Sequence, residues 1–141
     1  STGLPSLADD TGLEVDALDG APGVYSARYA GEDASFLDNI EKLLRNLEGV
    51  SEVNRTARFR TVVTFVDGNK ELHSEGIVEG IITADQKGSG GFGYDPIFLP
   101  RDSQSTFSEM TQMEKNKISH RAKALIKMKK ILEPYFKKEN I

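Results

Sequence analysis

The 141-residue sequence contains no cysteine. Disulfide bridges, thiol catalysis and cysteine-based zinc sites are therefore excluded, and the composition is compatible with a reducing cytoplasm. No apolar run is long enough to span a bilayer, and the first residues lack the basic-then-apolar pattern of a signal peptide. These absences predict a cytoplasmic protein without a membrane partner.

Positive charge is also in deficit, because 18 Lys and Arg residues face 22 Asp and Glu residues and the net charge is −4. This balance argues against a nucleic-acid partner, whose phosphate backbone is bound through excess basic charge. A single phosphorylated metabolite remains possible, since a divalent cation and a few lysines can offset its charge. The length and the 38% apolar fraction predict one globular domain that spans residues 1–141.

Strand and helix patterns alternate along the chain, which predicts an α/β fold with a mixed, twisted sheet flanked by helices. Alternating or short apolar runs predict strands, and the turn signal Asp67-Gly68 predicts that two of them form a long antiparallel hairpin. These strands are expected at 4–8, 13–18, 55–67, 70–83 and 96–100.

Helical spacing of apolar residues predicts a helix over 33–48, with Asp33 as its N-cap and Gly49 as its stop. A second apolar face runs from Ile118 to Tyr135 in the last third of the chain. Thr111 and Glu114 match a capping box ahead of it, so this third predicts a C-terminal helix.

Three segments have residue types that are suited to chemistry. The run Gly88–Phe98 combines an adaptable glycine-rich backbone with aromatic rings and a carboxylate, which suits a planar hydrogen-bonding ligand, although a loose hairpin explains it equally well. Asp9 and Asp10 follow an apolar run, where they either bind a metal ion or form a plain Asx-turn. In the run Glu114–Arg121, Ser119 stands at a possible helix start, and the donors gathered there suit an anion or a carbonyl oxygen unless they simply face water.

Taken together and in order, these segments resemble the inosine-triphosphate pyrophosphatase family, whose members hydrolyse non-standard purine nucleoside triphosphates. The likeness covers nearly the whole chain and departs at Thr11, where a serine is common and the hydroxyl is kept. The matching strings are Leu7–Leu13, Gly20–Arg28, Gly90–Pro96 and Lys117–Arg121.

The resemblance implies a role for each matching residue. Asp10 resembles the general base and the metal-binding carboxylate, with Asp9 beside it as a supporting metal ligand and Thr11 as a substrate contact. The other matches resemble a base-binding loop, a further nucleotide contact and a pair that reads the purine, namely Phe92, Gly93, Tyr94, Asp95, Lys115, His120 and Arg121.

The implied reaction is attack of water on the α-phosphate of inosine, deoxyinosine or xanthosine triphosphate, which releases pyrophosphate and a nucleoside monophosphate with the help of Mg²⁺. The resemblance also implies a cytoplasmic homodimer. His120, Arg121 and the N–H groups of the loop offer mainly donors, so they should prefer a 6-oxo purine over adenine.

Family members begin with a strand and a Ser/Thr-x-Asn-x-x-Lys phosphate loop, and a helical region follows. The sequence contains no such loop. We therefore expect the chain to be the larger, C-terminal part of the family fold, with an exposed sheet edge and little or no activity in isolation. A nucleotide-binding module without catalysis, or a structural fragment that binds no nucleotide, remains an alternative.

Overall fold

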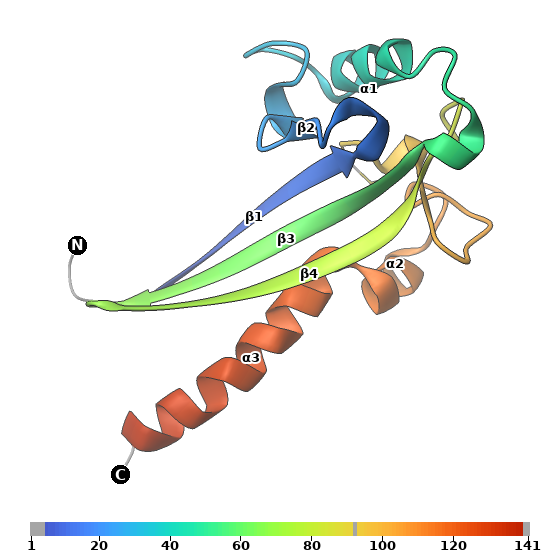
Figure 1. The fold of residues 1–141 in the computed structure, drawn as a ribbon. Coiled ribbons are helices and arrows are strands. Elements are labelled where there is room, and N and C mark those ends of the chain that lie inside the picture. Colours follow the sequence, from blue (N-terminus) through green and yellow to red (C-terminus); the bar gives the residue numbers. More distant parts are fainter. Residues whose placement is uncertain (1–4, 92, 140–141) are drawn as a thin grey trace.

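The computed structural model describes residues 5–91 and 93–139, with side chains described as far as Pro134. A five-stranded sheet runs through the molecule in the order β2-β1-β3-β4-β5 and twists along its length (Figure 1). The strands are β1 (Ser6–Val15), β2 (Pro22–Gly23), β3 (Thr56–Asp67), β4 (Lys70–Ile82) and β5 (Phe98–Pro100). The α/β class predicted from the sequence is confirmed.

The direction of the strands differs from the expected mixed sheet, since every strand pair among the described residues is antiparallel. After β1, the chain passes through β2 and helix α1 (Phe36–Asn46) and returns to the end of the sheet that it left. Strand β3 therefore begins beside the end of β1 and must run in the opposite direction. The connection between them is not a crossover of the kind that produces parallel neighbours.

Strand β1 is continuous through Asp9 and Asp10, where the sequence predicted the end of a strand and an Asx-turn was one of two alternatives. Both residues pair with β3, Asp9 with Val63 and Asp10 with Val62. Aspartate is uncommon in strands because its side chain tends to form hydrogen bonds with nearby main-chain groups. Here the long ladder of pairs with β3 outweighs that local tendency. The predicted second strand ends at Val15, after which the chain forms a 3₁₀ turn.

The predicted hairpin of β3 and β4 is confirmed over its whole length. Every second residue of β3 from Ala57 to Phe65 is buried, as expected for a strand with one covered face. Asp67 pairs with Lys70, so Gly68 and Asn69 form the connecting turn. Gly68 has φ +62°, the conformation that a type II′ turn requires at its first central residue.

Helix α1 is shorter than predicted and begins after Ser35, which replaces Asp33 as the N-cap. The Ser35 hydroxyl accepts a hydrogen bond from the Asp38 N–H, and the Asp38 carboxylate accepts one from the Ser35 N–H. This reciprocal capping box satisfies two donors at the helix start. The apolar face of α1 buries Ile40 and Leu43 in the main core.

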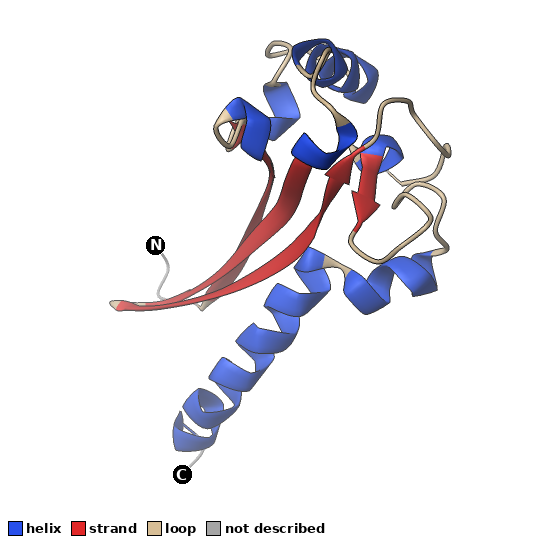
Figure 2. Ribbon diagram, turned by 45° about the vertical axis from the view of Figure 1, so that its right-hand side comes forward, coloured by secondary structure: helices blue, strands red, loops and turns tan. Residues whose placement is uncertain are grey.

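The C-terminal third forms two helices, α2 (Gln112–Ile118) and α3 (His120–Glu139), rather than one. The capping box of Thr111 and Glu114 is confirmed at the start of α2. Ser119 separates the helices with extended torsions, φ −59° and ψ 135°, so the prediction of a helix start at this residue is also correct. The break turns α3 so that it begins beneath the hairpin and extends obliquely away from it (Figure 2).

Close contact with β4 fixes the first turns of α3. A Cβ atom on Gly76 would collide with the main-chain oxygen of His120, so only glycine permits this approach. The Ser74 hydroxyl donates a hydrogen bond of 2.7 Å to the Ala124 carbonyl. Ala124 and Met128 then pack under the hairpin in a small second core.

Short 3₁₀ turns complete the described part of the chain, at Asp16–Leu18, Ser26–Arg28, Glu52–Asn54 and Asp95–Ile97. The last of these occupies the start of the strand predicted at 96–100, which shortens β5. None of the helices in the described ranges is both long and apolar enough to cross a membrane.

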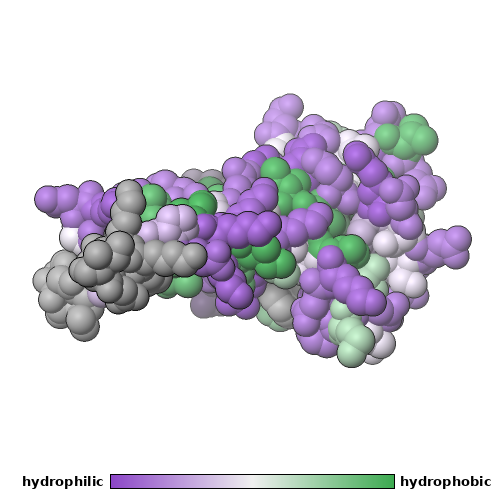
Figure 3. Space-filling view, turned by 90° about the horizontal axis from the view of Figure 1, so that it is seen from below, coloured by the Kyte–Doolittle hydropathy of each residue, from purple (hydrophilic) through white to green (hydrophobic). Residues whose placement is uncertain are grey.

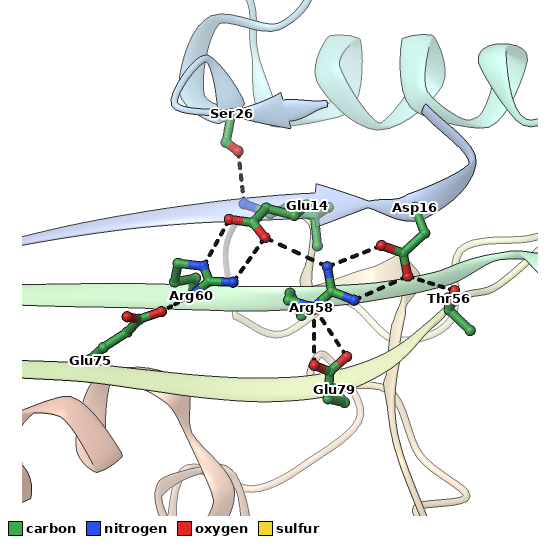
Figure 4. A network of polar contacts seen from close by, with 9 residues as sticks. Glu14, Asp16, Ser26, Thr56, Arg58, Arg60, Glu75 and Glu79 are labelled. Carbon is green, nitrogen blue, oxygen red and sulfur yellow. Dashed lines mark hydrogen bonds and ion pairs between the residues drawn. The ribbon is translucent and has the colours of Figure 1, made fainter. Parts of the chain in front are cut away.

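The face of the sheet opposite α3 carries a network of charges across β1, β3 and β4 (Figure 4). Arg58 donates to both Asp16, at 3.0 and 3.1 Å, and Glu79, at 3.0 and 3.3 Å. Arg60 bridges Glu14 and Glu75. Opposite charges on neighbouring strands alternate in this network, so it supports the register of the sheet.

Candidate active site

A cavity of about 560 Å³ opens where β1, the glycine-rich loop and the junction of α2 and α3 meet. All of the predicted substrate-binding residues in the described ranges line it, although they lie more than 100 positions apart at the extremes. These residues are Thr11, Gly93, Tyr94, Asp95, Lys115, His120 and Arg121. Phe92 lies outside the described residues.

The glycine-rich loop forms one wall because its backbone adopts conformations that favour glycine. Gly88, Gly91 and Gly93 have φ values of +91°, +73° and +61°. A Cβ atom on Gly91 would collide with the Asp95 carboxylate, so this glycine also gives the acid its place. The Ser108 hydroxyl donates to the Gly90 carbonyl and holds the outer part of the loop.

Asp95 and Lys115 form a buried ion pair at the cavity, with 2.6 Å between Lys115 Nζ and Asp95 Oδ2. Only 5% of the Asp95 side chain and 13% of the Lys115 side chain are exposed. Two buried charges this close stabilise each other, whereas either one alone would carry a large desolvation penalty. The pair therefore ties the glycine-rich loop to helix α2.

Tyr94 is buried and connects two walls of the cavity. Its hydroxyl donates a hydrogen bond of 2.6 Å to the Ser26 carbonyl. Burial raises the pKa of the Tyr94 phenol, and the nearby Tyr29 adds to the effect. The phenol thus remains a neutral donor. The Ser26 hydroxyl in turn accepts from the Leu13 N–H at 2.9 Å, which connects this wall to β1.

His120 is buried at the start of α3, and its ring stacks on Phe59 with 4.7 Å between the ring centroids. Burial, together with the smaller effects of the nearby Lys115 and Arg121 charges, lowers the pKa of His120 to about 4. The imidazole is therefore neutral near pH 7. Its Nδ1 atom is buried without a hydrogen-bond partner among the described residues. A polar atom in that position beside a cavity is suited to a ligand.

The two adjacent acids of β1 point to opposite faces of the strand. Asp9 lies on the same face as Thr11 and pairs through Oδ2 with Nε of Arg121. Asp10 lies on the other face, where it lines a second hollow of about 330 Å³ together with Glu14 and Arg60.

The two hollows adjoin the same part of β1, since Thr11 and Gly12 line both of them. Thr11 lies at this boundary, and its hydroxyl is 2.8 Å from the hydroxyl of the buried Thr61. Asp10 is therefore separated from the large cavity by the width of one strand.

The described residues contain no group of three or more acids, histidines or cysteines that could hold a metal ion by themselves. Mg²⁺ commonly takes only one or two protein carboxylates and completes its shell with phosphate oxygens and water. The carboxylate of Asp10 provides hard oxygen donors of this kind, and it has no ion-pair partner among the described residues. Asp9 is engaged by Arg121. The donor set thus fits a magnesium ion held jointly by Asp10 and a phosphorylated substrate.

Sequence reasoning missed two residues from helix α1 that line the cavity, Phe36 and Asn39. Asn39 is 2% exposed, accepts from the Ala30 N–H at 2.8 Å and donates to the Ala27 carbonyl at 3.1 Å. It stands three residues after Phe36 and four before Leu43, on the buried face of the helix. A polar residue at such a position was the signal that could have found it.

Comparison with known proteins places this site among relatives. The model of the Ham1 family matches residues 1–131. The dITP/XTP pyrophosphatase of Bacillus licheniformis is 52% identical over 133 residues, which cover 94% of this chain and 68% of that protein. The dITP/XTP pyrophosphatase of Desulforamulus reducens is 54% identical over 132 residues, which cover 93% of this chain and 66% of that protein.

A solved structure agrees with the fold. The Ham1 protein of Staphylococcus aureus superposes with a TM-score of 0.90 at 40% identity, covering 95% of this chain and 69% of that one. The chain thus spans about two thirds of the length of the relatives it matches.

Proposed function

Because the chain belongs to the Ham1 family, we propose that it provides the purine-binding part of a pyrophosphatase for non-standard nucleoside triphosphates. The substrates would be inosine, deoxyinosine and xanthosine triphosphates, and the products the nucleoside monophosphate and pyrophosphate. We also propose that the enzyme is a cytoplasmic homodimer. The names of the relatives support the substrate class, since two of them are dITP/XTP pyrophosphatases.

The observation that carries the proposal is the convergence of distant segments on one cavity, with donors from several of them. Lys115 and Arg121 contribute cationic N–H groups at its wall, and the glycine-rich loop contributes main-chain N–H groups. A 6-oxo purine presents an acceptor to such donors, whereas adenine presents an amino group. A buried donor that loses its partner costs about 1–3 kcal/mol, so two or three such contacts give strong discrimination.

Asp10 is the residue that we propose as general base. It would take a proton from water while the water oxygen attacks the α-phosphorus, and the bond from that phosphorus to the oxygen that leads to the β-phosphate would break. The lining that the two hollows share at Thr11 and Gly12 supports this arrangement, because a nucleotide with its base in the large cavity would have only one strand to pass before its phosphates reach Asp10. A bound Mg²⁺ would shield the phosphate charge and make the water more acidic.

The alternative is a nucleotide-binding module without catalysis. The groups that line the cavity in the described residues can bind a purine base without taking part in catalysis. On this view, the cavity binds the purine and no hydrolysis follows.

Separate measurements of binding and turnover distinguish these functions. The dissociation constants of inosine triphosphate and ATP are measured by calorimetry, and pyrophosphate release is followed with Mg²⁺ present. Preferential binding of inosine triphosphate together with pyrophosphate release supports the enzyme, and binding without product supports the module. Equal affinity for ATP would contradict both, since the cavity would then not read the 6-oxo group.

A further inference from the structure

Asp9 and Asp10 are neighbours in sequence, but the strand divides their surroundings. Asp10 faces the hollow that contains Glu14 and Arg60, whereas Asp9 faces helix α3. In the described part of the chain, the partner of Asp9 is the guanidinium of Arg121. The two acids therefore have different surroundings, and a shared role at one metal ion does not account for the contact of Asp9 with Arg121.

The contact between Asp9 and Arg121 uses one particular part of the guanidinium. The donor is Nε, the N–H nearest to the main chain, and the acceptor is Oδ2 of Asp9. The two terminal nitrogens of Arg121 make no hydrogen bond to the described residues, and Arg121 lines the cavity. A guanidinium is a rigid fork, so a bond at Nε fixes the direction in which its terminal N–H groups point.

The fold fixes the main chain of Arg121, but apart from the contact with Asp9 it does not fix the direction of the side chain. The first turn of α3 is anchored on β4 by the close approach at Gly76. The side chain of Arg121 is nevertheless 63% exposed, and that of Asp9 is 33% exposed. An exposed ion pair adds little to folding stability, so the effect of this pair falls mainly on the orientation of Arg121.

We propose that Asp9 is a positioning residue for purine discrimination, which holds the guanidinium of Arg121 so that its terminal N–H groups face the cavity and meet the 6-oxo group. This inference rests on the proposed function of the cavity. It assigns Asp9 to base selection and leaves the metal-linked chemistry to Asp10. The two acids then connect the two halves of the site. Strand β1 holds Arg121, which recognises the purine, through Asp9 on one face, and it carries Asp10, the proposed general base, on the other.

A binding experiment without metal separates this role from a role as metal ligand. Inosine monophosphate and adenosine monophosphate are titrated into the 141-residue chain in the presence of a chelator, and the ratio of their dissociation constants is the readout. In Asp9→Asn, the preference for inosine monophosphate should fall by a factor of about two to five, the scale of one exposed charge-assisted contact. The matched control is Asp33→Asn, which makes the same charge change at an exposed position before α1 and should leave the ratio unchanged.

A double-mutant cycle tests whether Asp9 acts through Arg121. If it does, Arg121→Ala lowers the preference, and Asp9→Asn has no further effect in the Arg121→Ala background. An unchanged ratio in Asp9→Asn, or an equal additional loss in the double variant, overturns the inference while the proposed function stands. If the unmodified chain does not prefer inosine monophosphate, the proposed function itself fails.

Discussion

At the scale of single residues, the walls of the cavity contain polar groups that burial keeps neutral. Tyr94 donates to a main-chain carbonyl of the opposite wall, and His120 stacks on Phe59 with Nδ1 unpartnered among the described residues. Charge at the site is thereby confined to the Asp95–Lys115 pair and to Arg121 among these lining groups. A neutral wall with a few fixed cations suits a purine better than an arbitrary anion.

His120 makes stability depend on pH in a defined direction. Its folded pKa of about 4 lies below the ordinary value of 6.5, so the unfolded chain binds more protons between these values. The contribution of neutral His120 to the free energy of unfolding is therefore fully present above pH 6.5 and is lost as the pH falls toward 4. Between pH 7 and 5, we expect His120→Gln to remove ~1–2 kcal/mol of the pH-dependent loss in unfolding free energy, as measured by urea denaturation.

The matched control for this experiment is His73→Gln on the exposed hairpin. The same measurement on this variant shows how much of the change follows from replacing a histidine outside the cavity. An identical slope in His120→Gln and the unmodified chain would show that His120 does not titrate in this range.

Tyr94→Phe removes one hydroxyl that connects the glycine-rich loop to the Ser26 segment. The loss leaves the Ser26 carbonyl without this donor, and we expect unfolding free energy to fall by about 1 kcal/mol. Binding of inosine triphosphate should weaken as well, because both walls line the cavity. Calorimetry and urea denaturation measure the two effects. Tyr25→Phe, at an exposed ring, is the control. Equal affinities in the unmodified chain and both variants would show that the Tyr94 hydroxyl does not support the cavity.

At the scale of elements, the sequence predicts what local chemistry decides. The capping box at Thr111 and the hairpin around Gly68 were correct because a few adjacent residues determine them. The path of β1 through Asp9 and Asp10 was missed because the partner strand β3 overrides a weak local preference. Long-range packing of this kind leaves little trace in a short window.

The site shows the same division between local and long-range information. The string Lys117–Arg121 and the glycine-rich run identified residues that line the cavity. The separation of Asp9 from Asp10 required the register of β1 against β3, and the contribution of Asn39 required the docking of α1. Neither can be read from spacing alone.

The docking of α3 depends on Gly76. In Gly76→Ala, the added methyl group meets the His120 carbonyl, so the helix or the strand must shift. We expect a loss of about 2–3 kcal/mol in unfolding free energy and weaker binding of inosine triphosphate, because His120 and Arg121 move with the helix. Gly49→Ala is the comparison, because it adds the same methyl group in open space. Gly49 has φ +81°, so any cost of that variant comes from backbone strain and not from a collision. Full stability and affinity in Gly76→Ala would mean that α3 does not pack as described.

The charge network on the other face of the sheet should make stability depend on salt. Arg58 lies between Glu14, Asp16 and Glu79, and its hydrogen bond is the main reason that the pKa of Asp16 is lowered. Arg58→Met leaves these carboxylates to repel one another. We expect a loss of about 1 kcal/mol in low salt that shrinks in about 1 M salt, where the Debye length is only about 3 Å.

Urea denaturation at the two salt concentrations measures this loss, with Arg45→Met at the exposed end of α1 as the control. A loss in Arg58→Met that is the same in both salts would assign the role of Arg58 to packing instead of charge.

At the scale of the whole molecule, the sheet separates two kinds of surface. Seen from below, the face with α3 shows apolar side chains near its middle and hydrophilic ones around them (Figure 3). The opposite face of the sheet carries the ion pairs of Figure 4. Among the described residues, the outer edge of β1 pairs with β2 only at Leu13 and Glu14.

The central claim is that one cavity between β1, the glycine-rich loop and the start of α3 binds a 6-oxo purine. Titration of the ¹⁵N-labelled chain with inosine triphosphate, followed by amide chemical shifts, tests it most directly. We predict saturable shifts at Gly93, Asp95 and Arg121, and much smaller ones with ATP at the same concentration. Shifts confined to the hairpin turn at Gly68, or equal responses to the two nucleotides, would contradict the account.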